Sequence, residues 1–219
     1  MDHVASDGRG CGVVFASLSR PETPKSMEAF LVSTGAVAIA EIGDKTQLLA
    51  FVLAARFRKP VPIIAGILFA TLFNHSLAGA LGTWLMTVIG PTPLRWILGL
   101  SFLAMAAWTL IPDKVDDDAT ASVAGRLGVF GTTFVAFFLA EMGDKTQLAT
   151  IALAAKYAAP VAVIGGTTLG MMIANVPAVY LGDRLLTRVP MRLVHTGAAI
   201  LFAGLGLATL FGAGARFGF

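Results

Sequence analysis

The chain has 219 residues, of which 56% are hydrophobic and only 13% are charged, and its formal net charge at pH 7 is +3. With so few charged residues, the chain has too little polar surface to cover a soluble globule. The composition therefore excludes an ordinary soluble domain and indicates a polytopic membrane protein. The small net charge and the lack of basic stretches interleaved with aromatics argue against a nucleic-acid partner. A single cysteine, Cys11, excludes an intrachain disulfide and a cysteine-based metal cluster.

Residues 1–26 differ from the rest of the chain because charged residues and prolines surround one short apolar patch, "CGVVFASLS". A secretory signal would need a basic start and a longer apolar run. We therefore expect either a disordered tail or an extension that precedes a true start at Met27.

Apolar stretches long enough to cross a bilayer follow one another along the chain. A helix needs about 20 such residues. Six spans are predicted, at 29–54, 61–86, 94–112, 128–154, 160–183 and 193–212. Charged and turn-forming residues separate them, as in "RFRKP" and "PDKVDDD". The predicted fold class is an all-α membrane protein with six transmembrane helices.

The sequence also repeats itself, without a gap, at a distance of one hundred residues. The matched pairs include Glu41/Glu141, Gly43/Gly143, Asp44/Asp144, Lys45/Lys145, Thr46/Thr146 and Gln47/Gln147. This divides the chain into a first three-helix half at 27–112, an acidic linker at 113–127, and a second half with a short tail at 128–219. Because three is odd, the second half enters the membrane from the opposite side, as in the inverted repeats of secondary transporters.

Lysine and arginine are more frequent in the loops that join spans 1–2, 3–4 and 5–6 than on the other side. The positive-inside bias places these loops in the cytoplasm. Both termini are then expected outside.

The first span carries the unusual phrase "AEIGDKTQLLA" at residues 40–50, and "AEMGDKTQLAT" repeats it at 140–150. On a continuous helix, Glu41, Asp44 and Lys45 share one face. Gln47 borders that face, while Thr46 points away from it and should matter less. Because a charge at the bilayer centre costs roughly 2.5–3.5 kcal/mol, these groups are expected to face protein or water rather than lipid.

The pseudo-twofold of an inverted repeat would bring the two phrases together at the midplane. Four carboxylates and two amide oxygens then form a cage of hard donors that suits Ca²⁺, Mn²⁺ or Mg²⁺. The predicted ligands are Glu41, Asp44, Gln47, Glu141, Asp144 and Gln147. In the alternative reading, each glutamate merely pairs with the lysine four residues later on its own helix. That reading leaves both aspartates unexplained.

Further residues are predicted to support this site. They are Lys45, Lys145, Thr46, Thr146, Asn74, His75 and Asn175. His75 lies in the second span, where it is either a packed, hydrogen-bonded group or a proton acceptor. Gly166 and Gly170 form a GxxxG pattern, which is typical of a close helix contact.

The doubled Glu-x-Gly-Asp-Lys-Thr phrase, one copy in each half, resembles the signature of the small cation/proton exchanger family of Golgi, thylakoid and bacterial membranes. The resemblance covers about residues 27–212. It implies exchange of Mn²⁺ or Ca²⁺ for protons, and in a bacterium Mn²⁺ export across the inner membrane. The metal is then a substrate and not a cofactor, and Glu41, Asp44, Glu141 and Asp144 are implicated as its site.

Two other functions compete with an exchanger. A passive divalent-cation channel would use the same oxygen cage without proton coupling. An intramembrane aspartyl hydrolase would have a Gly-x-Gly-Asp loop, to which "EIGD" and "EMGD" are similar. Here glutamate replaces the first glycine and lysine follows each aspartate, which opposes the shared proton of such a dyad. The sequence therefore favours a transporter over an enzyme.

Overall fold

The computed structural model describes residues 24–111, 127–181 and 191–212. These ranges are helical and contain no strand, which confirms the all-α fold class. Residues 1–23 of the predicted tail and most of the linker lie outside the described residues, while residues 24–26 form the start of α1. The helices are α1 (Pro24–Glu41), α2 (Lys45–Phe57), α3 (Pro60–Val88), α4 (Pro91–Thr109), α5 (Gly128–Glu141), α6 (Lys145–Tyr157), α7 (Pro160–Leu181) and α9 (Met191–Leu210).

The first span of each half is broken at the repeated phrase, so the prediction of continuous helices over 29–54 and 128–154 is wrong. Helix α1 ends at Glu41 and α2 begins at Lys45, and α5 and α6 are divided in the same way. Gly43 and Gly143 have φ angles of 83° and 76°, a left-handed conformation that stops a helix and favours glycine. The residue after each glycine, an aspartate, is the N-cap of the next helix, and the Asp144 side chain accepts a hydrogen bond from the Thr146 N–H.

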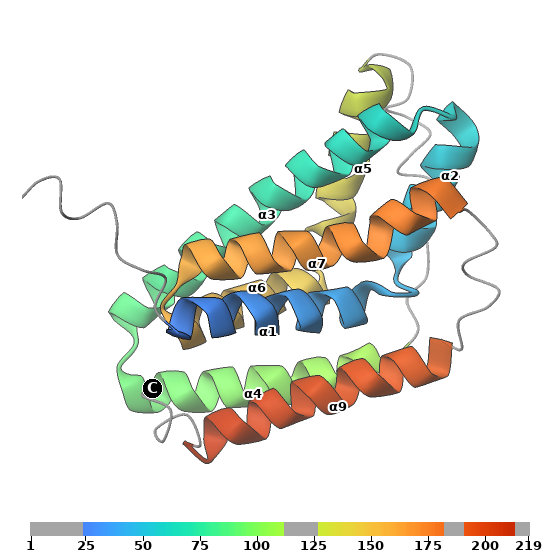
Figure 1. Cartoon of the computed structure of the whole chain (residues 1–219). Helices are drawn as coiled ribbons and strands as arrows, with labels where there is room; N and C mark the ends of the chain where they lie inside the picture. The colour runs from blue at the N-terminus through green and yellow to red at the C-terminus, as the bar shows by residue number, and fades with distance from the viewer. Residues whose placement is uncertain (1–23, 112–126, 182–190, 213–219) are drawn as a thin grey trace, which may run out of the picture.

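The one-hundred-residue period is visible in the helices themselves. Helices α2 and α6 begin at Lys45 and Lys145, and α3 and α7 begin at Pro60 and Pro160. In Figure 1, α3 and α7 run in opposite directions, and so do α4 and α9. The two helices of each of these corresponding pairs are therefore antiparallel.

Contacts between the halves also come in matched pairs. Helix α1 packs along α7, and α3 packs along α5. Glycine permits both approaches, because a Cβ at Gly66 would lie 2.7 Å from the Thr133 Cβ, and one at Gly166 would lie 2.5 Å from the Phe30 carbonyl oxygen. The close helix contact predicted at Gly166 is confirmed. Helices α4 and α9 pack on each other and form a separate layer beside α1 and α6 (Figure 1).

The surface of the bundle is apolar, as a membrane protein requires. Helices α3 and α7 and residues Arg192–Leu210 of α9 are each long and apolar enough to cross a membrane. Many large hydrophobic side chains are exposed, among them Phe69, Phe73, Trp84, Trp96 and Ile200. In water such a surface would drive association, whereas a lipid bilayer accommodates it.

Candidate metal site

Each repeated phrase folds as a tight turn between two half-helices. The glutamate is the last residue of the first half-helix, and the aspartate is the N-cap of the second. The Gly43 N–H donates to Gln47 Oε1 at 2.8 Å, and the Gly143 N–H donates to Gln147 Oε1 at 2.7 Å. This is a variant of the capping box, in which the third helical residue reaches back to close the turn. The glutamines therefore hold the turns, and their predicted role as metal ligands stays a prediction.

The two turns bring buried carboxylates from both halves together. One carboxylate oxygen from each of Glu41, Glu141 and Asp144 lies within 4.8 Å of the others. Glu41 Oε1 and Glu141 Oε1 are buried and have no hydrogen-bond partner among the described residues. Both glutamates also sit at helix C-termini, where the helix dipole disfavours a negative charge and favours a cation. This cluster offers hard, unsatisfied oxygen donors for a divalent metal ion.

The threonine of each turn orients the glutamate of the same turn. The Thr46 hydroxyl donates to Glu41 Oε2 at 2.6 Å, and the Thr146 hydroxyl donates to Glu141 Oε2 at 3.0 Å. The expectation that Thr46 points away from the carboxylates is wrong. It assumed one continuous helix, and the break re-aims α2 so that Thr46 faces Glu41.

The lysines pair across the two halves. Lys45 Nζ lies 2.9 Å from Asp144 Oδ1, and Lys145 Nζ forms an ion pair with Asp44 Oδ1. The alternative of Glu–Lys pairs along one helix does not apply, because Glu41 ends α1 and Lys45 begins α2. The same break invalidates the idea that Glu41, Asp44 and Lys45 share one helix face.

The two halves are not equivalent in this conformation. The Lys145 side chain is only 2% exposed, whereas that of Lys45 is 27% exposed. Asp144 contributes an oxygen to the carboxylate cluster, and Asp44 is not part of it. The structure thus brings together three of the four carboxylates that the sequence singled out.

The predicted polar residues of α3 and α7, which are Asn74, His75 and Asn175, are all buried. Gln147 Nε2 donates to Asn74 Oδ1, and Gln47 Nε2 donates to the carbonyl oxygen of Ala174, the repeat counterpart of Asn74. Asn175 Nδ2 instead donates to the Met171 carbonyl oxygen within α7.

His75 has no hydrogen-bond partner among the described residues on either ring nitrogen. Asn74 therefore contacts the turns directly, while a supporting role for His75 and Asn175 stays a prediction. The sequence analysis missed the Ala174 carbonyl and the two glycine N–H groups, because backbone groups leave no mark in residue identity.

Comparison with known proteins decides the family. The model of the family described as "Divalent cation/proton antiporter GDT1" matches residues 29–117 and 129–216. The chain belongs to the GDT1 family. The resemblance to a cation/proton exchanger family is thereby confirmed, and the protein is a multi-pass membrane transporter and not an enzyme.

Several relatives match most of the length of this GDT1 member. A Vibrio cholerae protein named "Putative manganese exporter" is 48% identical over 200 residues, which cover 90% of this chain and 98% of the relative. "GDT1-like protein 4" of Oryza sativa subsp. indica is 31% identical, over 94% of this chain and 79% of the relative. "GDT1-like protein 3" of Arabidopsis thaliana is 29% identical, over 86% and 72%. No solved structure is significantly similar to this chain.

Proposed function

We propose that this GDT1-family protein exports Mn²⁺ across a bacterial inner membrane in exchange for protons, and that Glu41, Glu141 and Asp144 hold the ion. The name of the Vibrio cholerae relative supports the choice of metal and the direction. The observation that carries the proposal is the convergence of three buried carboxylates from both halves within 4.8 Å. Mn²⁺ is the transported substrate here, so no resident cofactor is involved.

The ligand types suit this metal. Mn²⁺ accepts carboxylate oxygens, and the two unpartnered glutamate oxygens are buried where water cannot satisfy them. The threonine hydroxyls hold the other oxygen of each glutamate and so fix the direction of its free lone pairs. An ion bound here would also lie at the C-terminal ends of α1 and α5, which stabilise a positive charge.

The charge of the region suggests how metal and protons are coupled. Four carboxylates (Glu41, Asp44, Glu141 and Asp144) and two lysines (Lys45 and Lys145) leave a formal charge of −2 when all are ionised. One divalent cation neutralises this excess, and so do two protons. The two loaded states then carry the same charge, so a single site can exchange one Mn²⁺ for two protons without a separate proton path.

We further propose that the six predicted spans form two inverted halves that swap roles during transport. Half-helix ends that meet near the middle of the bundle are a common device of such transporters. In the present state Asp144 belongs to the carboxylate cluster and Asp44 pairs with the buried Lys145. In the opposite-facing state, the pseudo-symmetry would place Asp44 in the cluster and expose Lys145. The present asymmetry supports the view that this is one of the two facing states.

Transport by purified protein in liposomes tests the function. The interior is set at about pH 6 and the exterior at about pH 7.5, and uptake of Mn²⁺, Ca²⁺, Mg²⁺ and Zn²⁺ is compared. We expect the outward proton gradient to drive Mn²⁺ uptake most strongly, and internal alkalinisation should accompany it. Liposomes with the Glu141→Gln variant serve as the matched control. Mn²⁺ uptake that does not depend on the pH gradient and is not accompanied by proton transport would favour a passive channel instead.

A further inference from the structure

A cavity lies at one end of the bundle, away from the carboxylate cluster. It encloses about 670 Å³ and is formed by the start of α1 and α4, the α6–α7 junction and the ends of α3 and α9. Lys156 on its wall is eleven residues beyond Lys145 along α6, which corresponds to about 16 Å of helix. Because so many helices begin or end here, the cavity lies at the level where a bilayer meets water.

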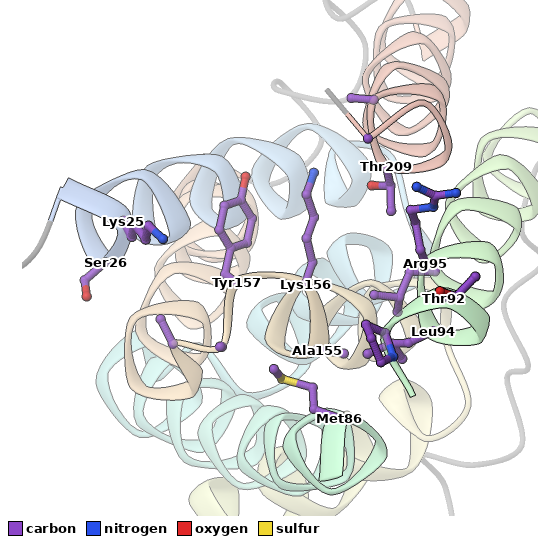
Figure 2. Close-up of a pocket in the computed structure, with 16 residues that line it drawn as sticks. Lys25, Ser26, Met86, Thr92, Leu94, Arg95, Ala155, Lys156, Tyr157 and Thr209 are labelled. Atoms are coloured by element: carbon purple, nitrogen blue, oxygen red, sulfur yellow. The ribbon is translucent and has the colours of Figure 1, made fainter. Parts of the chain in front are cut away.

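Three cations from three different helices line this cavity: Lys25 of α1, Arg95 of α4 and Lys156 of α6. Figure 2 shows Lys156 between Lys25 and Tyr157 on one side and Arg95 on the other. In the part of the chain that the structure describes, neither Arg95 nor Lys156 forms an ion pair with a carboxylate. Glu28 of α1 accepts a hydrogen bond from the Tyr157 hydroxyl at 3.4 Å.

The remainder of the lining is mostly apolar. It includes Met86, Leu94, Leu98 and Ala155. Lys156 Nζ also lies 5.3 Å from the centre of the Tyr157 ring and 6.0 Å from that of Phe102, so aromatic rings flank the ammonium group. Such a lining does not suit the passage of Mn²⁺, because three positive charges at the wall repel a divalent cation. It suits a ligand with a negatively charged head and an apolar body.

We propose that this cavity binds one anionic phospholipid. The phosphate lies among Lys25, Arg95 and Lys156, where charge-assisted hydrogen bonds recognise its oxygens. The beginning of the acyl chains packs against Met86 and Leu98. The position at the helix ends favours a lipid over a soluble anion, because phospholipid headgroups are concentrated at this level of the bilayer. The bound lipid would fill the space between the α4–α9 layer and the rest of the bundle.

Native mass spectrometry of the purified full chain tests this proposal, with phosphatidylglycerol titrated into delipidated protein in detergent. We expect one tightly bound lipid per chain, and an apparent affinity at least about tenfold lower in the Arg95→Gln/Lys156→Gln double variant. Arg56→Gln is the matched control, because Arg56 is the repeat counterpart of Lys156 and lies beside the Phe57 ring as Lys156 lies beside Tyr157. Arg56→Gln should keep the lipid at wild-type affinity.

Further measurements distinguish an anionic lipid from other ligands of this cavity. Arg95→Lys keeps the charge and should keep the lipid, and Mn²⁺ binding at the distant carboxylates reports that each variant is folded. Displacement of the lipid by inorganic phosphate alone would overturn the proposal in favour of a soluble-anion site. Equal binding of uncharged diacylglycerol would show that the cavity recognises only the apolar part of a lipid, and this would also reject the proposal. Equal lipid affinity in the double variant and the wild type would also reject the proposal.

Discussion

Lys145 at the start of α6 forms an ion pair with Asp44 at the N-cap of α2, and both side chains are almost fully buried. This contact links the second half of the chain to the first. Its counterpart joins Lys45 to Asp144 at 2.9 Å, with Lys45 partly exposed. The molecule thus contains one buried and one partly exposed lysine–aspartate pair. The contributions of the two pairs to the stability of the fold can be compared directly.

Replacement of Lys145 by glutamine should destabilise the fold strongly. Removal of one partner of a buried ion pair leaves an uncompensated charge and costs about 3–5 kcal/mol. Lys45→Gln should cost clearly less, since water can reach the more exposed pair. Thermal unfolding in detergent measures both, and the Asp44→Asn/Lys145→Gln double variant should recover part of the loss. Equal destabilisation by the two single changes would contradict the assigned asymmetry.

Thr46→Ala should impair Mn²⁺ transport although the protein still inserts and folds. The Thr46 hydroxyl donates to Glu41 Oε2 at 2.6 Å, and loss of a hydrogen bond to a charged group costs about 1.5–3 kcal/mol. We expect Mn²⁺ binding that is weaker by about tenfold or more, measured by isothermal titration calorimetry. Thr46→Ser keeps the hydroxyl and should restore binding. Thr109→Ala is the control, because its buried hydroxyl donates to the Met105 carbonyl oxygen of its own helix. Wild-type affinity in Thr46→Ala would refute the positioning role.

Much of the architecture could be predicted from the sequence because the bilayer imposes a simple length rule on apolar stretches. The gapless repeat located matching helices to the residue, as the starts of α3 and α7 at Pro60 and Pro160 illustrate. The breaks within the first span of each half were not predicted. Apolar residues continue on both sides of each turn, so hydropathy alone gives no sign of an interruption.

The signal for the breaks was nevertheless present in the repeated phrase. Gly43 followed by Asp44 is a helix stop followed by an N-cap, and Gln47 stands at the third helical position where a capping box places it. The pairing of Lys145 with Asp44 depends on the packing of the two halves, which no local pattern specifies.

Gly143→Ala tests whether the break itself matters. Gly143 has a φ angle of 76°, and a Cβ there would meet no atom within 4 Å, so conformational strain is the only obstacle. A left-handed conformation costs an L-residue about 1–2 kcal/mol, so we expect lower thermal stability and weaker Mn²⁺ binding. Gly143→Asn should be milder, because asparagine tolerates this conformation. Gly204→Ala in α9 also meets no atom within 4 Å and, as an ordinary helical position, should be neutral or stabilising. Unchanged stability and binding in Gly143→Ala would show that the turn does not depend on glycine.

The two aspartates should separate binding from turnover. Asp144 belongs to the carboxylate cluster in this state, so Asp144→Asn should weaken Mn²⁺ binding to this state. Asp44→Asn should lower stability as Lys145→Gln does, because it removes the buried carboxylate that pairs with Lys145. In the folded protein it should leave the Mn²⁺ affinity closer to wild type and yet abolish transport, because Asp44 serves the opposite-facing state in the proposed cycle. Mn²⁺ binding and liposome flux are measured on the same preparations. Continued transport by either variant would reject the exchange of roles between the halves.

The proposed exchange of one Mn²⁺ for two protons should be electrically silent. The site carries the same charge with either cargo, so no net charge crosses the membrane in a full cycle. In liposomes clamped with valinomycin and potassium, a pH difference of one unit should support a Mn²⁺ gradient of about 100-fold at any membrane potential. If only one proton returned, each cycle would move one charge, worth about 2.3 kcal/mol per 100 mV, and the Mn²⁺ gradient would shift about 50-fold when that potential is applied. A steady Mn²⁺ gradient that follows the potassium potential would therefore disprove the two-proton site, while one that follows only the pH difference would support it.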